Sequence, residues 1–144
     1  MNLCGAISSS YGEKLQCEFL EMNNFGITLY SCFVLSLENP NDDKIMTGYN
    51  GSHQLTKSDI DVKEIYIYGK EIEFIPANLG SLFHLTAFAM LETKLIEISF
   101  KDFQGMENLE RLNLRNNKLT HLSSNAFTNE LSLKLEPFHF YSLF

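Results

Sequence analysis

One segment of the chain sets a repeat, and it reads Leu112-Asn113-Leu114-Arg115-Asn116-Asn117-Lys118-Leu119. With Leu109 in front, it has the form Leu-x-x-Leu-x-Leu-x-x-Asn-x-Leu. The same apolar frame occurs 24 residues earlier and once more 23 residues before that. The frame positions are Leu109, Leu112, Leu114, Leu119, Leu122 and Phe127 in the last copy, Leu85, Phe88, Met90, Leu95, Ile98 and Phe103 in the middle copy, and Val62, Ile65, Ile67, Ile72 and Ile75 in the first. Three consecutive copies indicate a repeat architecture, because one copy cannot bury its own apolar face and must stack on its neighbours.

The spacing within each copy predicts two walls around a shared core. Apolar-x-apolar alternation, as in Ile65-x-Ile67 and Leu112-x-Leu114, predicts short parallel strands whose alternate side chains point inward. The later apolar residues of each copy, such as Ile98, predict an opposite wall of short 3₁₀ or helical turns. The chain has 144 residues, which is enough for one domain of this kind.

This pattern resembles the leucine-rich-repeat family, and the resemblance covers about Val62 to Phe127. It implies an α/β solenoid, a short right-handed horseshoe with parallel strands on its concave face. It also implies a ladder of hydrogen bonds between copies at the Asn position, which is Asn117 in the last copy. Thr93 can replace the asparagine in part, but Lys70 has no acceptor, so we predict a ladder that is broken at the first copy.

The residues before the repeats favour a hairpin. Cys17–Phe19 and Leu29–Leu35 are rich in aromatic and β-branched residues, and Asn23–Gly26 between them has turn chemistry. An antiparallel pairing of these runs would bring the cysteines of the two strands together. Ile45–Tyr49 is predicted as a further strand that leads into the first copy.

A cysteine-bearing hairpin ahead of the repeats resembles the N-terminal caps of extracellular leucine-rich-repeat proteins. That resemblance implies a disulfide between Cys17 and Cys32; two reduced, buried cysteines in a cytosolic protein are the alternative. Three cysteines leave one unpaired, and we assign Cys4. The predicted organisation is a poorly ordered or mispredicted segment at 1–15, an N-terminal β-hairpin cap at 16–61, three repeats at 62–130 and a degenerate or truncated end at 131–144.

The two ends of the chain depart from the pattern of a complete secreted array. Leu133 and Leu135 could form one more inward-facing strand, but the pattern stops after Pro137. The aromatic residues beyond it predict an interface, an aggregation liability or truncation of a longer array, and we favour truncation. These are Phe138, Phe140, Tyr141 and Phe144. The N-terminus lacks the basic start and apolar run of a signal peptide, and no segment reaches the ~20 apolar residues of a membrane span.

Composition and motifs argue against several functions. A net charge of −7 disfavours binding to nucleic acid or anionic lipid, which needs clustered Lys and Arg. The four histidines lack metal-ligand spacing, and no phosphate loop or nucleophile elbow occurs. Asn41-Asp42-Asp43 is better explained as a solvated turn than as a calcium site. We therefore predict no catalysis, no cofactor and no metal.

Ligands of this family usually meet the concave sheet, which implies where a partner would bind. The matching positions here put tyrosines and arginines, residue types enriched in interface hot spots, on one face. The predicted binding residues are Tyr66, Tyr68, Leu91, Arg111, Asn113 and Arg115, with the small Ala87 and Ala89 forming a shallow dip. The partner is expected to be a protein; its identity and the oligomeric state do not follow from the sequence.

The favoured function is a non-catalytic binding module, secreted or part of a receptor ectodomain. In that setting Asn50-Gly51-Ser52 is a glycosylation sequon at Asn50, although Asn-Gly also reads as a plain turn, which we favour. The alternatives are an intracellular, cytoplasmic scaffold with reduced cysteines, or a truncated gene product without a function of its own.

Overall fold

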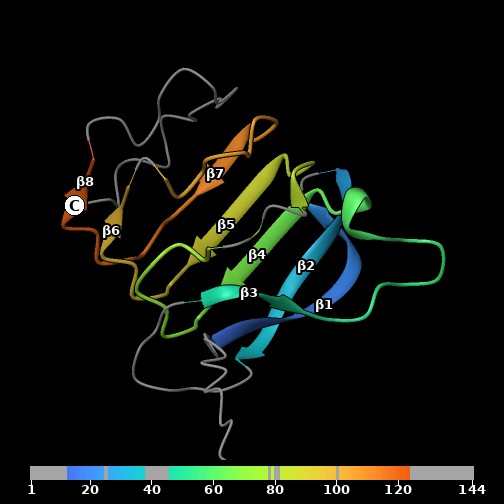
Figure 1. The fold of residues 1–144 in the computed structure, drawn as a ribbon, viewed down its shortest axis with the longest axis horizontal. Coiled ribbons are helices and arrows are strands. Elements are labelled where there is room, and N and C mark those ends of the chain that lie inside the picture. The colour runs from blue at the N-terminus through green and yellow to red at the C-terminus, as the bar shows by residue number, and fades with distance from the viewer. Residues whose placement is uncertain are drawn as a thin grey trace, which may run out of the picture.

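The structure is a computed structural model that describes residues 13–24, 26–37, 46–77, 79, 82–99 and 101–123. Its elements are β1 (Glu13–Asn24), β2 (Ile27–Leu37), β3 (Met46–Asn50), the 3₁₀ turn η1 (Asp59–Asp61), β4 (Glu64–Tyr68), β5 (Ala87–Leu91), β6 (Glu97–Ile98), β7 (Arg111–Asn113) and β8 (His121–Leu122). Six strands form one sheet in the order β3-β1-β2-β4-β5-β7, and β6 pairs with β8 beside it (Figure 1).

The first two strands form the predicted antiparallel hairpin, which is longer than the two apolar runs suggested. Gly26 closes its turn at φ +83°, a left-handed conformation that glycine adopts without strain, and Asn23 Oδ1 accepts its N–H at 3.2 Å. The implied disulfide joins Cys17 to Cys32 across the strands, with the two Cα atoms 5.0 Å apart. The further predicted strand is also present as β3, which pairs with β1 in parallel.

Parallel pairing then carries the sheet from the hairpin into the repeats. β2 pairs with β4, β4 with β5 and β5 with β7, so that Cys32, Ile65, Phe88 and Leu112 lie side by side on four strands. All four side chains are buried in one core, and so are the next inward residues Val34, Ile67, Met90 and Leu114. The predicted parallel strands with inward aliphatic side chains are therefore confirmed.

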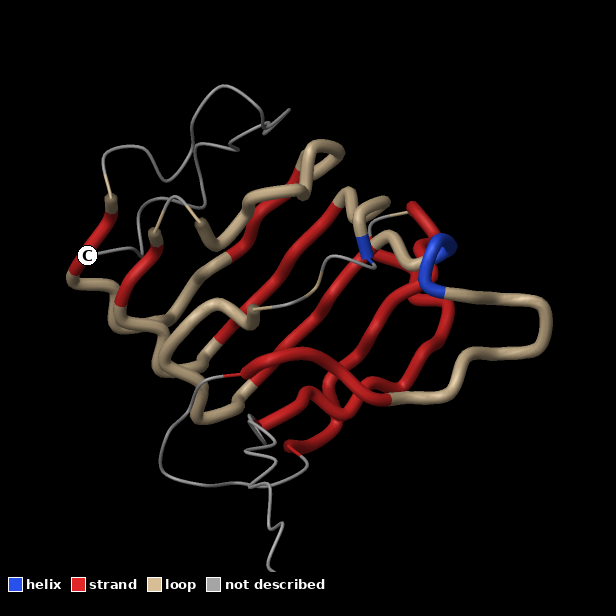
Figure 2. Tube along the Cα trace, viewed as in Figure 1, coloured by secondary structure: helices blue, strands red, loops and turns tan. Residues whose placement is uncertain are grey.

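The opposite wall agrees in part with the expectation of 3₁₀ or helical turns: it has tight turns, as where Met106 N–H donates to Phe103 O at 3.1 Å, but it also has two short strands. Figure 2 shows turns and the short strands β6 and β8 there, and 3₁₀ structure occurs in the described ranges at η1 and at Leu82, whose N–H donates to Leu79 O at 2.9 Å. Successive copies bond as neighbouring strands do, because Thr120 N–H donates to Ile96 O at 2.8 Å and Ser123 N–H to Ile98 O at 3.0 Å. The β-branched Ile96 and Ile98 favour this extended backbone, so the described part of the fold is a mixed sheet without an α-helix.

Each strand of a repeat ends in the same left-handed corner. Gly69, Glu92 and Asn116 occupy equivalent positions and have φ values of +64°, +51° and +59°. Behind the last corner Asn117 links the two later copies: its Oδ1 accepts the Thr93 N–H at 3.0 Å and its Nδ2 donates to Met90 O at 2.7 Å. The predicted Asn–Thr link is therefore present.

The expectations for residues 1–12, for Cys4, and for the end of the chain, including Leu133 and Leu135, lie outside the described residues.

Candidate functional site

The sheet has one face that is turned away from the core, and we call it the outer sheet face. Its side chains alternate with those of the hydrophobic core along β2, β4, β5 and β7. One row across the strands consists of Ser31, Glu64, Ala87 and Arg111, and the next consists of Phe33, Tyr66, Ala89 and Asn113. A third row holds Tyr68 and Leu91, and Arg115 continues it two residues after Asn113. All six predicted binding residues therefore share this face.

The two tyrosines are held by different neighbours. The Tyr66 ring stacks on Phe33, with ring centroids 5.7 Å apart and an interplanar angle of 17°. The Tyr68 side chain is exposed, and its hydroxyl donates to Glu92 Oε2 at 3.0 Å. This hydrogen bond and the Glu92 charge raise the pKa of Tyr68 above its ordinary value. Both rings are thus oriented in advance of a partner.

Phe33 extends the surface onto the hairpin, and the sequence analysis did not select it. The signal was present, because Phe33 alternates with the inward Cys32 and Val34 and so had to face outward. Its position beside Tyr66 required the β2–β4 register as well.

A buried carboxylate at the start of β4 was also missed. Glu64 is 6% exposed, and the fully buried Ser31 hydroxyl donates to its Oε2 at 2.9 Å. A carboxylate in this position is stabilised by a donor, because burying a charge without one is costly. The hydrogen bond turns Glu64 toward the hairpin.

The other side of the face carries the arginines. Arg111 and Arg115 form no ion pair with any residue in the described part of the chain. Asn113 lies between them, and its Oδ1 accepts the Arg115 N–H at 3.3 Å. The buried Ala87 and Ala89 separate this side from Glu64 and Tyr66. The outer sheet face is therefore polarised, with aromatic rings and bonded carboxylates toward the hairpin and arginines toward β7.

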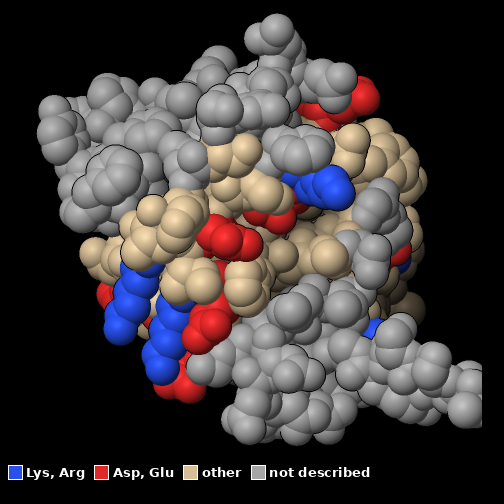
Figure 3. Space-filling model, turned by 60° about the vertical axis from the view of Figure 1, so that its left-hand side comes forward, with Lys and Arg blue, Asp and Glu red and all other residues tan. Residues whose placement is uncertain are grey.

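Away from the outer sheet face, basic and acidic side chains lie close to one another. Lys94 Nζ lies 2.8 Å from Glu71 Oε1, and Figure 3, with the β6–β8 side turned forward, shows basic and acidic side chains interspersed. No group of three His, Cys, Asp or Glu side chains in the described ranges could hold a metal ion. Over those same ranges, no helix is long and apolar enough to cross a bilayer.

The sequon residue Asn50 lies at the end of β3, half-buried and opposite Gln16 on β1. The favoured turn reading of Asn50-Gly51 is wrong, because the chain turns later, at Leu55 and Thr56. Gly51 instead packs against the hairpin: a Cβ there would meet Cys17 O at 2.5 Å and the Phe19 ring at 2.8 Å. Glycine is required by this close approach.

The loop after Gly51 is anchored by one histidine. His53 stacks on Phe19, with ring centroids 4.0 Å apart. The Tyr30 hydroxyl accepts the Gln54 N–H at 3.1 Å and is hydrogen-bonded to His53 Nδ1 at 3.1 Å, while His53 Nε2 is hydrogen-bonded to Asp59 Oδ1 at 2.8 Å. This chain of hydrogen bonds explains a histidine that the sequence left without a role.

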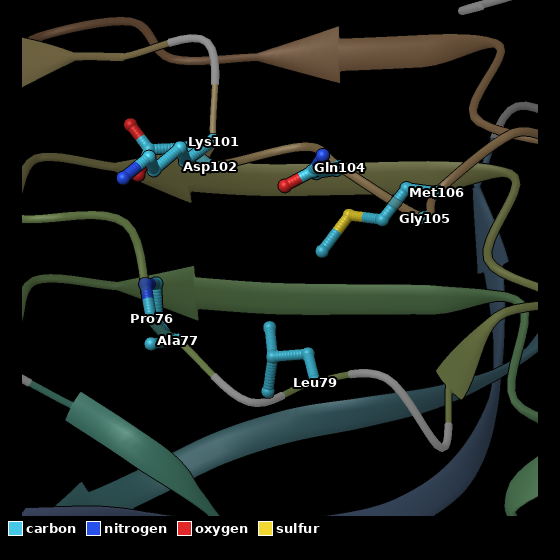
Figure 4. A pocket seen from close by; sticks show the side chains of 8 residues that line it. All are labelled: Pro76, Ala77, Leu79, Lys101, Asp102, Gln104, Gly105 and Met106. Carbon is cyan, nitrogen blue, oxygen red and sulfur yellow. The ribbon is translucent and has the colours of Figure 1, made fainter.

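A cavity of about 450 Å³ lies away from the outer sheet face, between residues 76–79 and 101–106 (Figure 4). Leu79 and Met106 supply its apolar lining, with Lys101, Asp102 and Gln104 along one side. Burial raises the pKa of Asp102, and Asp102 Oδ2 accepts the Ser99 N–H at 2.6 Å. The carboxyl thus serves the local turn, and we assign no chemistry to the cavity.

Comparison with known proteins agrees with the later part of the repeat. Residues 92–135 match the family model described as leucine rich repeat, which covers less than half of the chain and does not include the first copy. Searches of curated proteins and of solved structures found no match. Residues 92–135 therefore resemble leucine-rich repeats, and β7 within this range belongs to the same six-stranded sheet as the disulfide-linked hairpin.

Proposed function

We propose that this chain is a non-catalytic module that binds another protein through the outer sheet face. Leucine-rich repeats typically serve as protein-binding modules. The observation that carries the proposal is the gathering of Phe33, Tyr66 and Tyr68 with Arg111 and Arg115 on one face. Aromatic residues and arginine dominate the energetics of protein interfaces.

The two tyrosine rings of this face also favour tight binding because their orientation is already fixed. Tyr66 is stacked on Phe33, and Tyr68 is hydrogen-bonded to Glu92, so neither ring must be immobilised when a partner arrives. Ordering a free side chain at an interface costs about 0.5–1.5 kcal/mol. The preset orientation of both rings avoids much of that cost.

The proposal also includes the curvature of the repeats and the extracellular location of the protein. We infer that the copies curve into a right-handed horseshoe with the outer sheet face on its concave side, which small-angle scattering would test. The Cys17–Cys32 disulfide favours an oxidising, extracellular setting over an intracellular scaffold. In that setting Asn50 is a glycosylation candidate, and a mass shift after enzymatic deglycosylation of the secreted protein would identify the modified residue.

The test uses matched baits incubated with extracellular fluid. Wild type, Tyr66→Ala and the control Lys118→Gln, an exposed residue outside the outer sheet face, are compared by quantitative mass spectrometry. A partner should be retained by wild type and the control. With that partner purified, Tyr66→Ala should weaken binding about tenfold or more by calorimetry. Equal affinity for all three folded proteins would exclude this face as the binding surface.

A further inference from the structure

Resting on the proposed function, we further propose that the partner segment carries two carboxylates four residues apart on an extended backbone, and that Arg111 and Arg115 bind them.

The arginines have the geometry for such a pair. Arg111 begins β7, and Arg115 follows two residues after the strand ends, where its carbonyl still accepts the Glu92 N–H at 3.2 Å from the neighbouring copy. At ~3.3 Å per residue, four extended residues correspond to about 13 Å. Glu or Asp residues at positions i and i+4 of an extended partner have the same spacing and the same direction. Each guanidinium has five donors in a planar fork that matches a carboxylate with two parallel hydrogen bonds.

The carboxylates on the same face are engaged elsewhere. Glu64 accepts the Ser31 hydroxyl, and Glu92, which follows Leu91 on β5, accepts the Tyr68 hydroxyl. Neither forms an ion pair with an arginine among the described residues. Among the described residues, the arginines therefore have no carboxylate partner on this face.

The strand between the two sides carries small side chains. Ala87 and Ala89 lie between Glu64 and Tyr66 on one side and Arg111 and Asn113 on the other. Both alanines are buried, so an extended segment would lie over this strip and contact the larger side chains on either side of it. Its carboxylates would then point toward β7 and its other side chains toward the tyrosines.

Net charge distinguishes an acidic protein segment from a polyanion. The chain carries a net charge of −7. It therefore repels nucleic acids and sulfated polysaccharides, which are negatively charged along their whole length. A protein segment with only two carboxylates at the required spacing experiences less of this repulsion. Two arginines also match two carboxylates better than they match a continuous row of phosphates or sulfates.

The experiment uses three acetylated, amidated peptides and nuclear magnetic resonance of the arginine Nε–H groups. One has the sequence Glu-Val-Thr-Val-Glu, one has its two glutamates adjacent, and one has glutamine in both places. The spaced peptide should bind the wild-type protein at about millimolar Kd and shift both arginine signals. The other two peptides should bind at least threefold more weakly.

Variants identify the groups that bind the peptide. Arg111→Gln and Arg115→Gln should each weaken binding of the spaced peptide about threefold to tenfold, and added salt should weaken it in wild type. The control Lys118→Gln removes the same charge from an exposed position outside the face and should leave the affinity unchanged.

The remaining outcomes overturn the inference. They are equal binding of all three peptides, no binding of any, an unchanged affinity in both arginine variants, or binding of a heparin fragment through the arginines without binding of the spaced peptide. None of these touches the Tyr66→Ala comparison with the captured partner. That comparison tests the outer sheet face as a protein-binding surface independently of the partner's charge.

Discussion

Asn117 is the side chain that ties the two later copies together. Its amide group bonds the Thr93 N–H and the main-chain carbonyls of Met90 and Leu114. We expect Asn117→Ala to lower the free energy of unfolding by about 2–3 kcal/mol, because several half-buried polar groups lose their partner. Urea denaturation followed by circular dichroism measures this.

Asn108→Ala is the matched control, because Asn108 is exposed and bonds only the Phe83 carbonyl, at 3.3 Å. It should cost less than about 1 kcal/mol. If both variants lost the same free energy of unfolding, the Asn117 link would not stabilise the stacking of copies more than an ordinary surface hydrogen bond does.

Tyr68 should give the protein a pH-dependent stability in the alkaline range. Glu92 accepts the Tyr68 hydroxyl and holds its pKa above the ordinary 10.0. The folded state therefore keeps the phenol proton longer than the unfolded chain does. The contribution is complete below pH 10 and is lost as pH rises through the folded pKa.

Glu92→Gln should return the Tyr68 pKa toward its ordinary value, because the charge disappears. Ultraviolet titration of the phenolates, with Tyr68→Phe to assign the signal, measures the change. If the titration of Tyr68 were the same in Glu92→Gln and wild type, the hydrogen bond would not hold in solution.

At the scale of elements, the hairpin depends on its disulfide. The bridge closes a loop with a sequence separation of 15, for which the entropy of the unfolded chain predicts a stabilisation of roughly 3 kcal/mol. Cys17→Ser with Cys32→Ser should lose about that amount in urea denaturation. The β2–β4 ladder should weaken with it, since β2 is the strand on which the first copy pairs.

Mass spectrometry under non-reducing conditions supplies the accompanying measurement. The peptides that contain Cys17 and Cys32 should be recovered as one linked species from protein made in an oxidising compartment. Recovery as free thiols would favour the intracellular scaffold.

For the whole molecule, the stacked core decides whether the chain folds. Leu112 lies beside Phe88 in the buried row that runs through four strands. Leu112→Asp places an unpaired charge there and should abolish the cooperative thermal transition. Asn113→Asp adds the same charge on the outer sheet face one residue away and should retain the transition, so circular dichroism melts of the two variants distinguish core from surface.

Much of this arrangement could be predicted because an apolar frame repeated in phase can be satisfied only by stacking. The period of two along each strand predicts that Ile65, Met90 and Leu114 point inward, and all three are buried. The hairpin and the Asn117–Thr93 link also followed from local residue types. The pairing of β6 with β8 on the opposite wall did not, because residues such as Ile98 satisfy a turn or a short strand equally well until a neighbouring copy supplies hydrogen bonds.

Residue order alone thus settled which side chains face the core and which face outward, since that depends only on local periodicity. Tertiary structure alone settled which residues meet on the outward side: Ser31 reaches Glu64, 33 positions away, and Phe33 reaches Tyr66 only because β2 pairs with β4 in one register. That register is set by how the hairpin and the first copy pack together in the core, and no pattern within either segment encodes it.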